Sequence, residues 1–243
     1  MTATIEPQFR RRTHLGWADF LPRYLLVEAA CRGRRVLEVG TQDARSLVRL
    51  RDGGAARIVG TTPEPDVVDP GGLLDRKDEL LAMEEGRLGF EDDAFDVVLV
   101  VDLARQLARD PRFLDEVRRI LAADGFALIG FESGGRGLGQ VVDDRAPPPL
   151  LDAGRLQSAI RAAFADARFF QQTPFVGVAI HPEGNGQAAD VAVDPSLAAR
   201  SAQPSHVIAI AGAGTPGNLG PTLVEIPFLD FEATAQAAHA RSA

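Results

Sequence analysis

Hydrophobic positions in this chain alternate between short continuous runs and stretches in which they recur every three or four residues. Continuous runs are typical of strands buried on both faces of a sheet, whereas the recurring spacing is typical of amphipathic helices. The clearest run extends from Phe95 to Leu103 and is dominated by valine and leucine. The clearest helical spacing follows Asp110-Pro111, a pair that suits the N-cap and first turn of a helix, and it ends at Asp124-Gly125.

The rest of the chain continues this alternation of strands and helices. Further strands are predicted at residues 36–39, 57–61, 126–131, 168–180 and 206–211, and further helices at 17–31, 44–51 and 156–164. Residues 80–83 fit a strand or a helix equally well. Because alternating strands and helices form right-handed parallel crossovers, the predicted class is α/β, with a doubly wound, mostly parallel seven-stranded sheet and helices on both faces. The polar stretch 181–204 predicts that the last two strands form a C-terminal antiparallel hairpin.

The pattern divides the chain into three parts. Residues 1–16 are predicted to be an N-terminal basic arm, residues 17–212 the folded domain, and residues 213–243 a C-terminal extension. The extension contains an apolar segment at 223–231 and an alanine-rich helix candidate at 232–243. The apolar segment either packs on its own domain or adds to a sheet edge, where it would bind a protein partner or a second copy of the chain.

The overall charge bears on the kind of partner. The formal net charge is −8 and the isoelectric point is near 5.1. Nucleic-acid binding needs clustered positive charge, so no nucleic-acid partner is expected. Local arginine clusters at 10–12 and 32–35 are interpreted as solvated basic surface, with contact to an acidic partner as the alternative.

The single cysteine, the scattered histidines and the lack of a long apolar run each exclude one class of site or partner. Cys31 is the single cysteine, so neither an intramolecular disulfide nor a cysteine-based zinc site is expected. The four histidines are scattered without metal-ligand spacing, so no metal is expected. No stretch has the roughly 18 consecutive apolar residues that span a bilayer. We therefore expect a cytoplasmic protein without a membrane partner.

Three segments, residues 35–40, 88–98 and 116–125, resemble in order and spacing the motifs of class I S-adenosylmethionine-dependent methyltransferases. Residues 35–40, Arg-Val-Leu-Glu-Val-Gly, resemble the glycine motif at the end of the family's first strand. Residues 88–98 resemble the entry to its fourth strand, and residues 116–125 the helix and turn before its fifth. The resemblance covers about residues 17–211 and implies a Rossmann-like fold centred on residues 34–133.

The resemblance also implies where S-adenosylmethionine would bind. In the family, glycines after the first strand let the backbone approach the cofactor, and an acidic residue after the second strand accepts hydrogen bonds from the ribose. The positions implied as cofactor-binding here are Glu38, Gly40, Thr41, Gln42, Thr62, Glu84 and Asp102. Asp102 is also the candidate catalytic residue of an active enzyme, with helix N-cap as its alternative role. Glu85 is the alternative to Glu84, and both also fit a solvated loop.

Two of these positions depart from the family pattern. The glycine loop of the family is acidic-x-Gly-x-Gly-x-Gly, but here Gln42 occupies the second glycine position and Ala44 the third. The long side chain of Gln42 would enter the space of the cofactor's amino-acid or ribose portion. Thr62 stands where the ribose-binding acid is expected, and Glu64 or Asp66 follows a few residues late. The sequence therefore predicts a degenerate cofactor pocket.

Two functions follow from this combination of an intact framework and an altered pocket. The favoured hypothesis is a non-catalytic binding, regulatory or scaffold module; the alternative is an active methyltransferase that acts on a small molecule or a protein. An active enzyme of this kind needs no acid-base apparatus, because in-line methyl transfer depends mainly on positioning and desolvation. The glycine-rich stretch 134–139 lacks the lysine-serine or lysine-threonine pair of a phosphate loop and is interpreted as a flexible connection.

Overall fold

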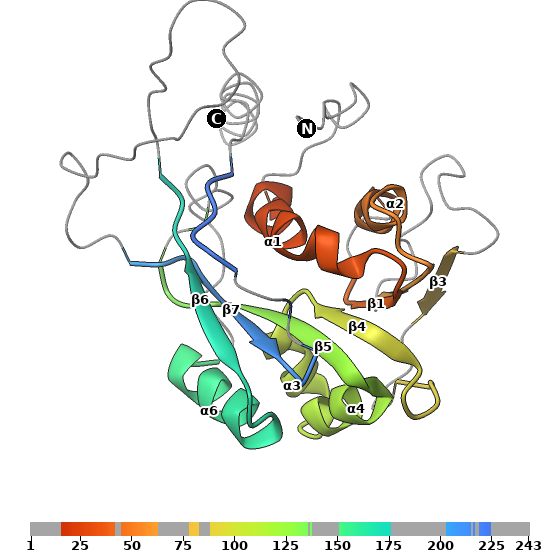
Figure 1. Ribbon diagram of the computed structural model, residues 1–243. Helices are drawn as coiled ribbons and strands as arrows, with labels where there is room; N and C mark the ends of the chain where they lie inside the picture. Colours follow the sequence, from red (N-terminus) through yellow and green to blue (C-terminus); the bar gives the residue numbers. More distant parts are fainter. Residues whose placement is uncertain are drawn as a thin grey trace, which may run out of the picture.

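The computed structural model describes residues 16–41, 45–62, 78–82, 88–135, 137, 151–175, 203–214, 216 and 219–224. Within these residues, seven strands form one sheet in the order β3-β2-β1-β4-β5-β7-β6 (Figure 1). The strands are β1 (Arg35–Val39), β2 (Arg57–Thr62), β3 (Asp78–Ala82), β4 (Phe95–Val100), β5 (Leu121–Glu132), β6 (Arg168–Gln172) and β7 (His206–Ala211). β7 pairs antiparallel with β5 and β6, and the other pairs are parallel. The predicted sheet and its C-terminal hairpin are confirmed.

Helices cover both faces of this sheet, as predicted (Figure 1). They are α1 (Gly16–Cys31), α2 (Arg45–Asp52), α3 (Leu103–Arg109), α4 (Phe113–Ile120) and α6 (Ala153–Ala163). α1 and α2 bury their apolar side chains against one face, whereas α3, α4 and α6 pack on the other. β1 and β4 lie at the centre, and their valines and leucines are buried because both faces are covered.

Several predicted boundaries were wrong, most of them around the fourth strand. β4 ends at Val100 rather than at Leu103, and the helix α3 follows it at once. Asp110 is the C-cap of α3 instead of the N-cap of α4, whose own N-cap is Arg112. The apolar run hid this helix because Leu103 and Ala104 are as buried as the strand before them. Periodicity cannot separate a buried strand from a short buried helix that continues it.

Two other elements also differ in extent from the prediction. Residues 78–82 are a strand, which settles the choice between strand and helix for this segment. β6 ends at Gln172, well short of residue 180, and residues 176–180 lie outside the described part of the chain. The same is true of the basic arm up to residue 15 and of the C-terminal extension from residue 225, so the predictions for these segments stay untested. No helix among the described residues is long and apolar enough to cross a membrane.

The first helix is fixed to the far half of the sheet by a buried arginine. Arg23 donates a hydrogen bond from Nη1 to the carbonyl oxygen of Val101 at 3.0 Å and one from Nε to Oε1 of Gln172 at 3.3 Å. Its guanidinium lies over Gly130 of β5, where any Cβ would collide with it. Burial first, and the positive charge of Arg23 second, lower the pKa of the neighbouring His206 to about 3. His206 is therefore held neutral inside the fold.

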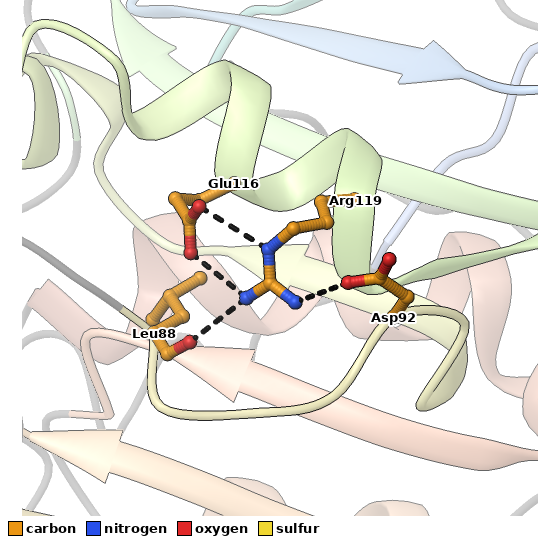
Figure 2. Close-up of polar contacts among 4 residues, drawn as sticks. All are labelled: Leu88, Asp92, Glu116 and Arg119. Carbon is orange, nitrogen blue, oxygen red and sulfur yellow. Dashed lines mark hydrogen bonds and ion pairs between the residues drawn. The ribbon is translucent and has the colours of Figure 1, made fainter.

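A second polar cluster fixes the turn before β4 to the helix α4 (Figure 2). The guanidinium of Arg119 binds both carboxylate oxygens of Glu116, at 3.2 and 2.9 Å, and Oδ1 of Asp92 at 2.7 Å. It also donates to the carbonyl oxygen of Leu88 at 3.2 Å. The hydrogen bonds from Glu116 and then Asp92 raise the pKa of Arg119 above its usual value. The turn that contains Asp92 is thus tied to α4, although the side chain of Asp92 is 75% exposed.

We expect the buried neutral His206 to make stability depend on pH. In the unfolded chain its pKa is near the ordinary 6.5, and in the fold it is about 3. Between these values only the unfolded chain takes up the proton, so stability is lost as the pH falls from 6.5 towards 3. His206→Gln should remove about 1.5 kcal/mol of the loss between pH 6.5 and pH 5, measured by urea unfolding at each pH. An unchanged pH slope in the variant would contradict this assignment.

We also expect Arg119 to stabilise the fold through the cluster of Figure 2. Arg119→Ala removes three carboxylate contacts and a carbonyl contact and should lower the free energy of unfolding by about 1 to 3 kcal/mol. Arg118→Ala, on the exposed face of the same helix, is the matched control and should change it by less than about 0.5 kcal/mol. Equal effects in the two variants would show that the cluster contributes nothing of its own.

Candidate functional site

The candidate site lies at the edge of the sheet where the parallel strands have their carboxyl ends. Gly40 follows β1 there, β2 ends in Thr62, and Val101 and Asp102 follow β4. In open α/β sheets, ligands bind in the crevice outside these strand ends, where the strand order reverses. The order here reverses between β1 and β4, so the segments after these two strands border the site.

The first of these segments keeps the backbone geometry that the glycine motif requires. Gly40 has a φ of +84°, a conformation that side chains with a Cβ rarely adopt. The backbone N–H groups of Gly40 and Thr41 both donate to the carbonyl oxygen of Thr61, at 2.9 and 2.8 Å. The turn is therefore joined to β2, and these two donors are already in use.

Glu38, implied by the resemblance as a cofactor contact, has both carboxylate oxygens bound within the protein. The hydroxyl of Tyr24 donates to Oε2 at 2.7 Å, and the hydroxyl of Ser46 donates to Oε1 at 2.9 Å. Only 1% of Glu38 is exposed. Burial, followed by the adjacent charge of Glu38, raises the pKa of Tyr24 well above its usual value, so the phenol stays protonated and can donate. Glu38 thus connects α1, β1 and α2.

Two threonines close the space between the first and second strands. The hydroxyls of Thr41 and Thr61 both point to the carbonyl oxygen of Glu38, at 3.4 and 3.5 Å. Gly60 permits this packing, because a Cβ on it would lie 2.7 Å from both Oγ1 of Thr41 and Cδ1 of Leu47. Thr41 is buried, so its side chain belongs to the floor of the site and not to its surface.

Thr62 ends β2 at the position where the family pattern has an acidic residue. Its side chain is buried, with 5% exposed, and carries no charge. The other residues implied on this side of the site, Gln42 and Glu84, lie outside the described residues, as do the late carboxylates Glu64 and Asp66. The described part of this side therefore contains a threonine hydroxyl where the family pattern has a carboxylate.

Asp102 lies at the site and is also the N-cap of α3. Its Oδ1 accepts a hydrogen bond from the backbone N–H of Arg105 at 3.3 Å, and its Oδ2 pairs with Nε of Arg105 at 3.3 Å. This is the capping role named as the alternative from the sequence. The side chain remains 30% exposed, so one carboxylate at the site edge still faces solvent in part.

The sequence did not indicate three of the residues that lie at the site. Its pattern placed Tyr24 only at an apolar position of a helix, and nothing in it pointed to Ser46. Gln106 lies on α3, the helix that the apolar run concealed, and its Nε2 lies 3.2 Å from the point that a Cβ on Gly40 would occupy. The spacing of apolar and polar residues after Val101 could have indicated the helix. It could not have given the direction of the Gln106 side chain. Among the described residues, no group of three or more potential metal ligands occurs.

Comparison with known proteins gives a consistent result. Residues 37–129 match the family described as Methyltransferase domain. No curated protein matches the chain. The fold is similar to that of S-adenosylmethionine-dependent methyltransferases of known structure from Thermotoga maritima, Aquifex aeolicus and Mesorhizobium loti.

The three structures resemble this chain over most of their own length. The Thermotoga protein is 20% identical, with a TM-score of 0.55 over 84% of this chain and 94% of that one. The Aquifex protein is 18% identical, with a TM-score of 0.51 over 70% and 93%. The Mesorhizobium protein is 13% identical, with a TM-score of 0.52 over 82% and 99%. Residues 37–129 thus match the methyltransferase-domain family, and the chain has the Rossmann-like fold that these S-adenosylmethionine-dependent methyltransferase structures share.

Proposed function

We propose that this chain is a methyltransferase-like binding module whose pocket no longer holds S-adenosylmethionine with the affinity of an enzyme. The observation that carries the proposal is the state of Glu38, whose two carboxylate oxygens are bound by Tyr24 and Ser46. A buried carboxyl that is satisfied in this way stabilises the fold and is not available to a ligand. The motif residue is retained for its structural role.

The backbone donors of the glycine turn support the same conclusion. The N–H groups of Gly40 and Thr41 are bound to Thr61, and the hydroxyl of Thr41 points to the carbonyl oxygen of Glu38. A cofactor would have to displace these bonds or rely on the loop that contains Gln42. These bonds support a pocket that does not fit S-adenosylmethionine, and no catalytic step is derived through it.

The ribose side adds an energetic argument. An acidic residue would accept two charge-assisted hydrogen bonds from the ribose, and the neutral hydroxyl of Thr62 cannot replace both. Bonds of this kind contribute about 1.5 to 3 kcal/mol each, so the loss is about 3 to 6 kcal/mol, or about two to four orders of magnitude in Kd. A site with a micromolar Kd would then bind the cofactor too weakly for cellular concentrations to fill it.

The second candidate function is an active methyltransferase that acts on a small molecule or a protein. It is favoured by the positive φ of Gly40, which keeps the motif geometry, and by the partly exposed Asp102 at the end of β4. In that case Asp102 would orient the methyl acceptor, and its bond to Arg105 would fix its direction. Cofactor affinity distinguishes the two functions.

Titration calorimetry with S-adenosylmethionine and S-adenosylhomocysteine tests the proposal. The unaltered chain should bind neither with a Kd below about 100 μM, and Gln42→Gly with Thr62→Asp should tighten binding by about 100-fold or more. Thr222→Asp adds the same charge at an exposed site and should change nothing. Micromolar binding by the unaltered chain would reject the degenerate pocket and establish the second candidate.

We propose that the chain binds a protein partner, or a second copy of itself, through the C-terminal extension. Leu223, at the start of the apolar segment, is 53% exposed, and an apolar side chain left in solvent is a candidate for contact. The acidic net charge does not favour nucleic acid, and the proposal involves no membrane.

Light scattering during gel filtration tests the extension. We expect the full chain to self-associate at tens of micromolar and a chain that ends at Val224 to remain a monomer with an unchanged circular dichroism spectrum. Leu223→Asp should weaken the association without removing any residue. A full chain that is monomeric at these concentrations would exclude the second copy and leave a different protein as the partner.

A further inference from the structure

We draw no further inference here: the strongest candidate, the apolar hollow between α1 and the end of β4 that Phe20, Arg23, Tyr24 and Val101 line, adjoins the candidate site already described, and nothing in the described part of the chain shows what would occupy it.

Discussion

A buried carboxyl group at the end of the first strand is the constraint on which the rest of the site depends. Glu38 has no access to water, so its two oxygens must be satisfied by the protein. Tyr24 and Ser46 satisfy them from the helices on either side of β1 in the sequence. The position of α1 and the start of α2 are thereby fixed to the strand that carries the glycine turn. A residue resembling a cofactor contact in the sequence is an internal connection in the fold.

The hydrogen bonds of Glu38 also determine which polar groups are already bound at the floor of the site. Once Glu38, Thr41 and Thr61 are bound to one another and to the backbone, the polar groups between β1 and β2 have been used. On the β4 side, the amide of Gln106 packs against the face of Gly40 that has no Cβ.

The far half of the sheet is held by a second buried polar group of the same helix. Arg23 reaches Val101 after β4 and Gln172 in β6, and its place over Gly130 requires a residue without a side chain there. α1 thus contacts the strand ends through Tyr24 on one side and Arg23 on the other. Because both residues are polar and buried, the helix cannot shift without leaving them unsatisfied, and the edge of the site is correspondingly rigid.

The sequence by itself determined the alternation of strands and helices except for α3, the seven-stranded sheet with its hairpin, and the altered positions Gln42 and Thr62, because these follow from local periodicity and from a motif read residue by residue. It did not show where β4 ends, since a buried helix continues the same apolar run. Only the tertiary structure decided that Glu38 faces Tyr24 and that Gln106 faces Gly40. The partner of a polar side chain depends on how distant elements cross in space, and periodicity along one element carries no information about that crossing.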